Sequence, residues 1–151
     1  MLAERVIVKI IFVGMKKTIN PFLHFNGNCK EALEYYKQIF NGNIEVLMLA
    51  KGKCAEEFDS ENSVFHSVLT FYNGMIIMAA DTRIGFGSTF GNNNFIVINF
   101  ESEEEIDRVY AAFAKDAIKI REELHKVFWN AKYAEFIDKF GVCWMFNFDF
   151  K

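Results

Sequence analysis

The chain has 151 residues and a mass of 17.5 kDa, the size of one domain or of two small units packed together. A formal net charge of −3 argues against a nucleic-acid partner, because affinity for phosphate backbones depends on clustered cations. Its three cysteines form no CxxC pair, which is typical of a reduced, cytoplasmic protein.

Residues 1–14 differ from the sequence that follows them. An apolar, β-prone run at residues 6–13 is interrupted by Lys9, and Met15 resembles a second start. The run is too short to cross a bilayer, so no membrane partner is expected. We interpret residues 1–14 as an N-terminal extension or an added strand, and residues 15–151 as a single domain.

A first module is expected at residues 19–80. It opens with an apolar strand at residues 19–25, and Asn28 with Glu31 predicts a capping box at the start of a helix. The apolar stripe of that helix has the spacing of one helical face and contains Cys29, Ala32, Leu33, Tyr36 and Phe40. Strands follow at residues 44–50, 64–71 and 75–80, with a polar loop at 51–62 and an Asn-Gly hairpin turn before the last strand.

The second module repeats that order at residues 94–148. Ser102 and Glu105 predict another capping box, before a helical stripe formed by Ile106, Val109, Tyr110 and Phe113. Strands are expected at residues 95–100, 117–124, 131–137 and 142–148.

Two consecutive βαβββ modules predict an α+β fold. One module alone is a four-stranded sheet with a helix on one face, and its other face needs a partner or a ligand, because exposed apolar sheet is unfavourable. Two modules side by side form an eight-stranded, curved mixed sheet with the helices on its outer face. The concave side of this sheet is a cup that supplies a cavity.

Two segments resemble a known superfamily. The strand followed by NGNCKEALEYY at residues 26–36 resembles the opening of vicinal-oxygen-chelate proteins, which include glyoxalase I, extradiol dioxygenases and bleomycin- or fosfomycin-resistance proteins. Phe128-Trp129 and the stretch DKFGVCWMFN at residues 138–147 resemble the C-terminal signature of PhnB-like proteins. The resemblance spans residues 19–148 and implies a homodimer. Some relatives carry a methyltransferase label, but this sequence has no glycine-rich nucleotide loop.

Metal enzymes of this superfamily place a His or Glu on each of four cavity strands. Alignment by the helix caps and by the glycine before the last strand puts those positions near Pro21, Met78, Phe95 and Met145. None of these side chains can bind a hard cation. We therefore expect no metal of the superfamily type, and no other cofactor.

His66 and Glu135 are the candidate catalytic residues. His66 is expected in the cup with a pKa suited to proton transfer, and a structural, hydrogen-bonded histidine is the alternative. Glu135 in an aromatic pocket would act as a base, and an exposed charge or a partner for Lys132 is the alternative. His24 is expected to face the helix layer, in a structural role.

Strand alternation predicts which other residues contact a ligand. The residues placed in the cup are Phe25, Met78, Phe95, Asn99, Tyr133, Cys143, Met145 and Asn147. Arg83 is a candidate clamp for an anionic group, with a mobile crossover loop as the alternative. Trp129 is a candidate lid over a planar ligand, or a residue of an interface. The remaining side chains of the last strand, Trp144, Phe146 and Phe148, are expected to face the helices.

Two classes of function stay open. The first is non-catalytic binding of a small, aromatic or apolar molecule in the cup. The second is a metal-independent lyase, isomerase or dioxygenase-type enzyme that uses His66 and Glu135. In either class we expect a homodimer, because the paired modules leave two sheet edges and an open mouth, and residues 6–13 also need covering.

Overall fold

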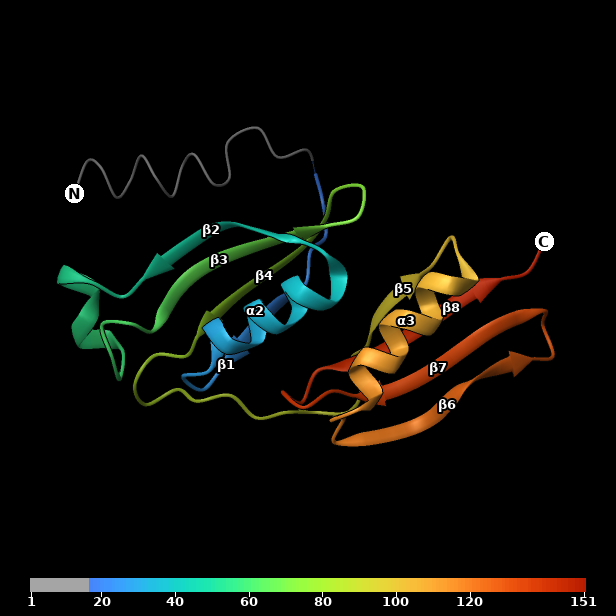
Figure 1. Ribbon diagram of the computed structural model, residues 1–151. Coiled ribbons are helices and arrows are strands. Elements are labelled where there is room, and N and C mark those ends of the chain that lie inside the picture. Colours follow the sequence, from blue (N-terminus) through green and yellow to red (C-terminus); the bar gives the residue numbers. More distant parts are fainter. Residues whose placement is uncertain (1–16) are drawn as a thin grey trace.

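The computed structural model describes residues 17–151, so the interpretation of residues 1–14 lies outside the described part. Two βαβββ modules follow one another along the chain (Figure 1). Module 1 consists of β1 (Phe22–Phe25), α2 (Cys29–Phe40), β2 (Asn43–Leu49), the 3-10 helix η1 (Gly52–Glu57), β3 (Val64–Phe71) and β4 (Met75–Asp81). Module 2 consists of β5 (Ile96–Asn99), α3 (Glu103–Ala114), β6 (Lys119–Val127), β7 (Ala131–Ile137) and β8 (Cys143–Asp149). The α+β fold class is confirmed, and η1 occupies part of the expected polar loop.

The eight expected strands form two hydrogen-bonded mixed sheets of four. Sheet 1 has the order β1-β4-β3-β2, and sheet 2 has the order β5-β8-β7-β6. In each sheet the first strand of the module pairs in parallel with the last, and the other neighbours are antiparallel. The two modules therefore share one topology, with β1 and β5 as the edge strands that border a common groove.

The helices cover one face of each sheet, α2 on sheet 1 and α3 on sheet 2 (Figure 1). Their apolar side chains belong to one core. The Trp144 ring on β8 lies 5.7 Å from that of Tyr36 and 5.6 Å from that of Phe40, both on α2. Phe113 on α3 lies 5.6 Å from Phe40. Since each aromatic side chain buries roughly 150–250 Å², these rings hold the two modules together. The predicted helical stripes are thus the surfaces through which the modules join.

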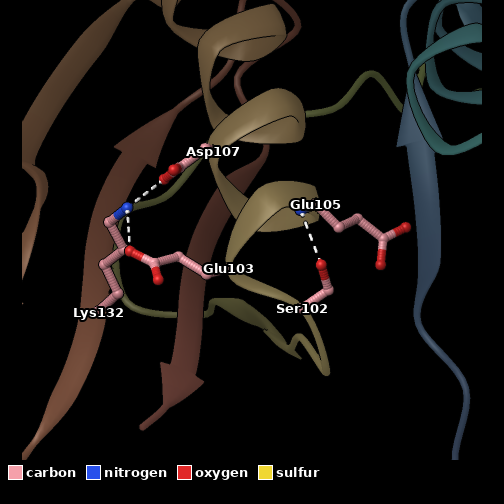
Figure 2. Close-up of polar contacts among 5 residues, drawn as sticks. All are labelled: Ser102, Glu103, Glu105, Asp107 and Lys132. Carbon is pink, nitrogen blue, oxygen red and sulfur yellow. Dashed lines mark hydrogen bonds and ion pairs between the residues drawn. The ribbon is translucent and has the colours of Figure 1, made fainter.

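The two helices begin in different ways. On α3, the Ser102 hydroxyl accepts a hydrogen bond from the Glu105 amide at 3.3 Å, which confirms the predicted cap (Figure 2). On α2, Asn28 occupies the N-cap position as predicted, but its side chain makes no cap bond, so the predicted capping box is wrong. Asp81 at the end of β4 replaces it, with a carboxylate oxygen 3.0 Å from the Cys29 amide.

Lys132 ties β7 to the first turn of α3. Its ammonium group donates to the carboxylates of Glu103 at 3.1 Å and Asp107 at 2.5 Å, and Figure 2 shows the three side chains converging between strand and helix. Acidic groups in this first turn are also favoured by the helix dipole. Lys132 therefore lies on the helix side of sheet 2 and is not the partner of Glu135.

A buried carboxylate, Asp138, joins the two modules. It accepts hydrogen bonds from the Tyr36 hydroxyl at 2.6 Å, Trp144 Nε1 at 2.9 Å, and the amides of Phe140 and Val142 at 2.8 and 3.0 Å. Burial raises the pKa of Asp138, and the hydrogen bonds from Tyr36 and Trp144 oppose that shift. Because Asp138 and Trp144 belong to the C-terminal signature, that signature includes the residues that attach module 2 to α2.

Candidate functional site

Each sheet has an open face, which we define as the face opposite its helix. On the open face of sheet 1, His24 on β1 lies opposite Ala80 on β4, and Met48 on β2 lies opposite His66 on β3. The opposite side of the same strands carries the residues of the core, including Leu69 and Ile77. Ala80 lies on β4, between His24 on β1 and His66 on β3, and its small side chain leaves room between the two imidazoles.

A cavity of about 610 Å³ occupies this open face, and we call it the module 1 cavity. Its volume is within the range of small-molecule sites, which are roughly 300–1,000 Å³. Met48, residues 80–83 and residues 86–88 contribute to its lining, and its aromatic and imidazole rings belong to Phe22, His24, Phe58, Phe65, His66 and Phe86. The arrangement is suited to a flat apolar molecule, because such rings supply stacking and edge contacts.

Two loops wall the module 1 cavity. Phe58 follows η1 and packs on Phe65 with the ring centroids 6.3 Å apart. The second wall is the segment after β4, where the Ile84 amide donates to the Glu57 carbonyl at 2.9 Å. The Asn26 side chain anchors this segment through its carbonyl oxygen, 2.7 Å from the Ser88 amide. The cavity therefore depends on contacts between loops that are distant in the sequence.

His66 lies in this cavity, on the strand face that its alternation predicts. Its side chain is buried, and the Phe22 ring lies 5.9 Å from its imidazole. Burial lowers the pKa of His66, because the low-dielectric surroundings disfavour the imidazolium. A neutral imidazole can accept or donate a hydrogen bond to a ligand, and it can take up a proton.

β1 is displaced by one residue from its expected orientation. Phe22 and His24 face the cavity, whereas we expected His24 to face the helices and Phe25 to lie in the cup. Phe25 instead is fully buried and packs against Phe140 at 6.2 Å. The parallel register with β4, which pairs Phe22 with the open-face residue Met78, decides this. A shift of one residue moves every side chain to the other face of a strand.

The open face of sheet 2 has the expected orientation but carries a different chemistry. Glu135 accepts a hydrogen bond from the Tyr133 hydroxyl at 2.7 Å and pairs with Arg121 Nε at 3.5 Å. The Arg121 guanidinium lies over the Phe95 ring, 5.0 Å from its centroid. Burial raises the pKa of Tyr133, with the Glu135 carboxylate acting in the same direction. Glu135 is thus a paired carboxylate on sheet 2 and does not line the module 1 cavity.

The other predicted ligand contacts are distributed over several places. Met145 lies beside Glu135 in the β7–β8 register, and Trp129 packs on Tyr133 at 5.7 Å in the β6–β7 turn. Asn147 donates to the Asn99 side chain at 3.3 Å. The predicted residues that border the groove between β1 and β5 are Phe25, Phe95 and Cys143. Burial raises the pKa of the Cys143 thiol, which favours the uncharged thiol at this position.

The structure therefore brings His66 and Arg83 together in the module 1 cavity but leaves Glu135 and most of the other predicted contacts outside it. Met78 lies on the same open face, beside Phe22 in the β1–β4 pairing. Sequence reasoning missed Phe22, His24, Met48, Phe58, Phe65 and Phe86 as lining residues. Antiparallel pairing of β2 with β3 places Met48 opposite His66, so the sequence could have predicted Met48 as a lining residue once that pairing was assumed. Phe58 and Phe86 lie outside the strands, where alternation carries no information.

The chemistry of the donor groups argues against the superfamily metal. On the open faces, Phe22, Met78, Val97 and Met145 lie at or beside the positions where the superfamily's metal enzymes have their ligands. Phe22 pairs with Met78 in sheet 1, and Val97 pairs with Met145 in sheet 2. These are rings, an aliphatic group and thioethers, which do not match a hard cation. Within residues 17–151, no group of three or more His, Cys, Asp or Glu side chains could hold a metal ion. In the same range, the helices lack the length and hydropathy of a membrane span.

Comparison with known proteins links the chain to one family. Residues 17–146 match the model of a family described as 3-demethylubiquinone-9 3-methyltransferase. A crystal structure of a protein from Pseudomonas aeruginosa is 32% identical, with a TM-score of 0.78 over 89% of this chain and 98% of that one. The PhnB protein of Bacillus cereus, a putative 3-demethylubiquinone-9 3-methyltransferase, is 27% identical, with a TM-score of 0.75 over 87% of this chain and 99% of that one.

More distant matches agree. Escherichia coli protein YjdN is 26% identical over 141 residues, which cover 85% of this chain and 93% of that protein. A glyoxalase/bleomycin resistance protein/dioxygenase domain from Frankia shares the fold, with a TM-score of 0.65 and 12% identity over 91% of this chain and 95% of that one.

Proposed function

Since the chain belongs to this PhnB-like family of the vicinal-oxygen-chelate superfamily, we propose that it binds a small aromatic or apolar molecule in the module 1 cavity. The observation that carries the proposal is the cavity of about 610 Å³ with its ring-lined wall. A largely apolar, concave site with a few polar groups is the usual form of a small-molecule site. Among the polar groups of the lining, His66 and Arg83 are the ones we propose to orient the ligand.

A blocking variant tests this proposal. Ala80→Phe places a ring on the floor of the cavity, and Val97→Phe places the same ring on the exposed open face of sheet 2 as a matched control. The neutral fluorescent probe N-phenyl-1-naphthylamine, whose emission rises in apolar sites, reports binding. We expect Ala80→Phe to weaken probe binding by at least about tenfold and Val97→Phe to leave it unchanged. Equal binding by both variants and the wild type would place the ligand site elsewhere.

Metal-independence is part of the proposal. It is supported by the apolar side chains at the expected ligand positions and by the donor groups present in residues 17–151. Elemental analysis of dialysed protein should find well below one equivalent of divalent metal. A full equivalent of zinc, nickel, manganese or iron would contradict the alignment from which this expectation comes.

The alternative is a metal-independent enzyme that uses His66 and Glu135. His66 lies in the cavity and its pKa is lowered by burial, which favours a neutral base. Glu135 lies on the open face of sheet 2 in a pair with Arg121, so a shared reaction site requires the two open faces to meet around one substrate. Turnover of a metabolite that disappears in both His66→Gln and Glu135→Gln would support this alternative over simple binding.

The description of the matching family adds a specific outcome to test. A 3-demethylubiquinone carries a flat quinone ring with oxygen substituents, and such a ring suits a cavity lined by phenylalanines. Methyl transfer also needs a site for an adenosyl methyl donor, and this sequence contains no glycine-rich strand-to-helix loop. We expect the protein to bind a demethylated quinone analogue without methylating it. Formation of methylated product from S-adenosylmethionine would assign the transferase activity instead.

We also propose that the chain is a homodimer. The support is the exposed apolar surface on the sheet 2 side, where Val97 is 54%, Trp129 is 48% and Phe128 is 96% exposed. Such surface is usually covered by a partner, and two-fold association is the commonest solution. Sedimentation equilibrium at micromolar concentration should give twice the 17.5 kDa mass of the chain. A species of 17.5 kDa that does not change with concentration would contradict the dimer.

A further inference from the structure

The module 1 cavity carries an ion pair beside its wall. Arg83 lines the cavity, and its Nε lies 3.0 Å from Glu57 Oε2. The two side chains are 55% and 49% exposed, so solvent reaches both. Glu57 is the last residue of η1 and Arg83 follows β4, so the pair connects the two loops that wall the cavity.

Besides the guanidinium of Arg83, the lining of the cavity contains the carboxylate of Asp81 and the imidazoles of His24 and His66. The Asp81 carboxylate is engaged on the helix side, where it accepts from the amides of Cys29 and Val64 at 3.0 and 2.8 Å. His66 has its pKa lowered by burial, so its imidazole is neutral. Within the described residues that line the cavity, Arg83 is the side chain that carries a permanent positive charge.

In the Arg83–Glu57 pair, another anionic group can readily replace the Glu57 carboxylate. Ion pairs between half-exposed side chains are weak, because water screens the charges and both side chains lose freedom. When the ring of a ligand is already held in the cavity, its carboxylate can pair with the guanidinium of Arg83 at little further cost in conformational entropy. It can also form two parallel hydrogen bonds with the guanidinium, a geometry that favours carboxylates and phosphates.

We propose that the module 1 cavity selects aromatic molecules that carry one negatively charged group, and that this group replaces Glu57 on Arg83. The proposal rests on the proposed function and adds the charge of the ligand to it. Arg83 is then the residue that determines specificity, and Glu57 is an internal competitor for the same guanidinium. Removal of the Glu57 charge should therefore strengthen binding, an effect that a purely structural ion pair would not produce.

Three probes that share one ring system separate charge from ring binding. These are 2-naphthoate, the neutral 2-naphthalenemethanol and the cationic 2-naphthylmethylammonium, titrated by calorimetry at neutral pH. We expect the wild type to bind 2-naphthoate about tenfold more tightly than the neutral probe, the size of effect typical of a hydrogen bond to a charged group. The preference should decrease as salt is added, because the site is open to solvent.

Variants of the ion pair identify its two roles. Arg83→Gln should reduce 2-naphthoate affinity about tenfold, to that of the neutral probe. Glu57→Gln should raise 2-naphthoate affinity several-fold and leave the neutral probe unchanged, since the backbone carbonyl of Glu57 that holds Ile84 is retained. Lys37→Gln is the matched control, because Lys37 forms a half-exposed pair with Glu34 on α2, at 43% and 47% exposure. It should change none of the three affinities.

The outcomes distinguish this inference from the proposed function. Tight binding of all three probes with equal affinity, or of 2-naphthoate without dependence on Arg83, would overturn the charge selection and leave aromatic binding in place. A loss of 2-naphthoate affinity in Glu57→Gln would overturn the competition between Glu57 and the ligand. Binding of none of the three probes would overturn the proposed function, and the charge selection with it.

Discussion

Modules 1 and 2 share one topology, but their open faces differ. Sheet 1 covers its open face with loops and forms a cavity with buried His66, whereas sheet 2 exposes Val97 and pairs Glu135 with Arg121. The difference arises in the two segments that wall the module 1 cavity, and the connection between the second and third strands of each module shows it most directly. Residues 50–63, including η1, join β2 to β3, while only residues 128–130 join β6 to β7. The longer connection supplies Phe58 and Glu57 to the wall, and a short turn cannot reach over its sheet.

The helix starts differ in the same way. α3 is capped by Ser102, which lies next to it in sequence, and α2 is capped by Asp81, which lies 52 residues beyond Cys29. The same Asp81 carboxylate also accepts from Val64 at 2.8 Å. At the start of its helix, module 1 thus depends on a long-range polar contact where module 2 uses a local one, so the effect of removing the Asp81 carboxylate should extend further through the structure.

The largest expected effect is at the junction of the two modules. Asp138→Ala leaves the Tyr36 hydroxyl and the Trp144 indole without their acceptor in a fully buried place. We expect a loss of about 4 kcal/mol in the free energy of unfolding, measured by urea denaturation. Asp59→Ala, at an exposed position, is the control and should change stability little. A loss below about 1 kcal/mol at Asp138 would mean that the modules are held by their rings alone.

The two caps provide a direct comparison of the modules. Asp81→Ala removes the acceptor of the buried amides of Cys29 and Val64, and should cost about 3 kcal/mol. Ser102→Ala removes one exposed cap bond and should cost about 1 kcal/mol. Urea unfolding of both variants measures the difference. Equal losses would show that a carboxylate acting from a distant strand is no more important than a local hydroxyl.

The pH dependence of stability should reflect His66. Its pKa is lowered in the folded state from an ordinary value of 6.5, so the unfolded chain binds the proton more tightly. The stabilisation is therefore present above the unfolded value and is lost as the pH falls from about 6.5 toward the folded pKa. His66→Gln should flatten this slope, whatever its effect at neutral pH. An unchanged slope between about pH 7 and 5 would show that other groups control acid stability in this range.

The smallest effect is expected on sheet 2. Glu135→Gln weakens a pair whose arginine is 40% exposed, so stability should change by less than about 1 kcal/mol. Binding of the neutral probe in the module 1 cavity should also be unchanged, in contrast to Ala80→Phe. Fluorescence titration of the variant checks this. A marked loss of probe binding would indicate that the open face of sheet 2 also contributes to the ligand site.

Several features of this protein were predictable from local sequence. The order of strands and helices follows from apolar periodicity, and the Ser102 cap follows from residues three apart. The orientation of β8 was also correct, with Trp144 and Phe146 in the core, because alternation along a regular strand needs only one reference residue. These features share a cause: the interacting groups are near one another in the chain.

Only the tertiary structure decided the rest. The register of β1 depends on its parallel pairing with β4, more than fifty residues away, and this pairing turned His24 into the cavity and Phe25 into the core. The cap from Asp81 and the contact between Glu57 and Arg83 likewise join segments that the chain brings together only on folding. Local periodicity carries no information about such pairings, because it specifies which residues share a face but not which strand lies beside it. The sequence alone determined the modules and their family resemblance, and the packing of distant loops determined where the cavity lies.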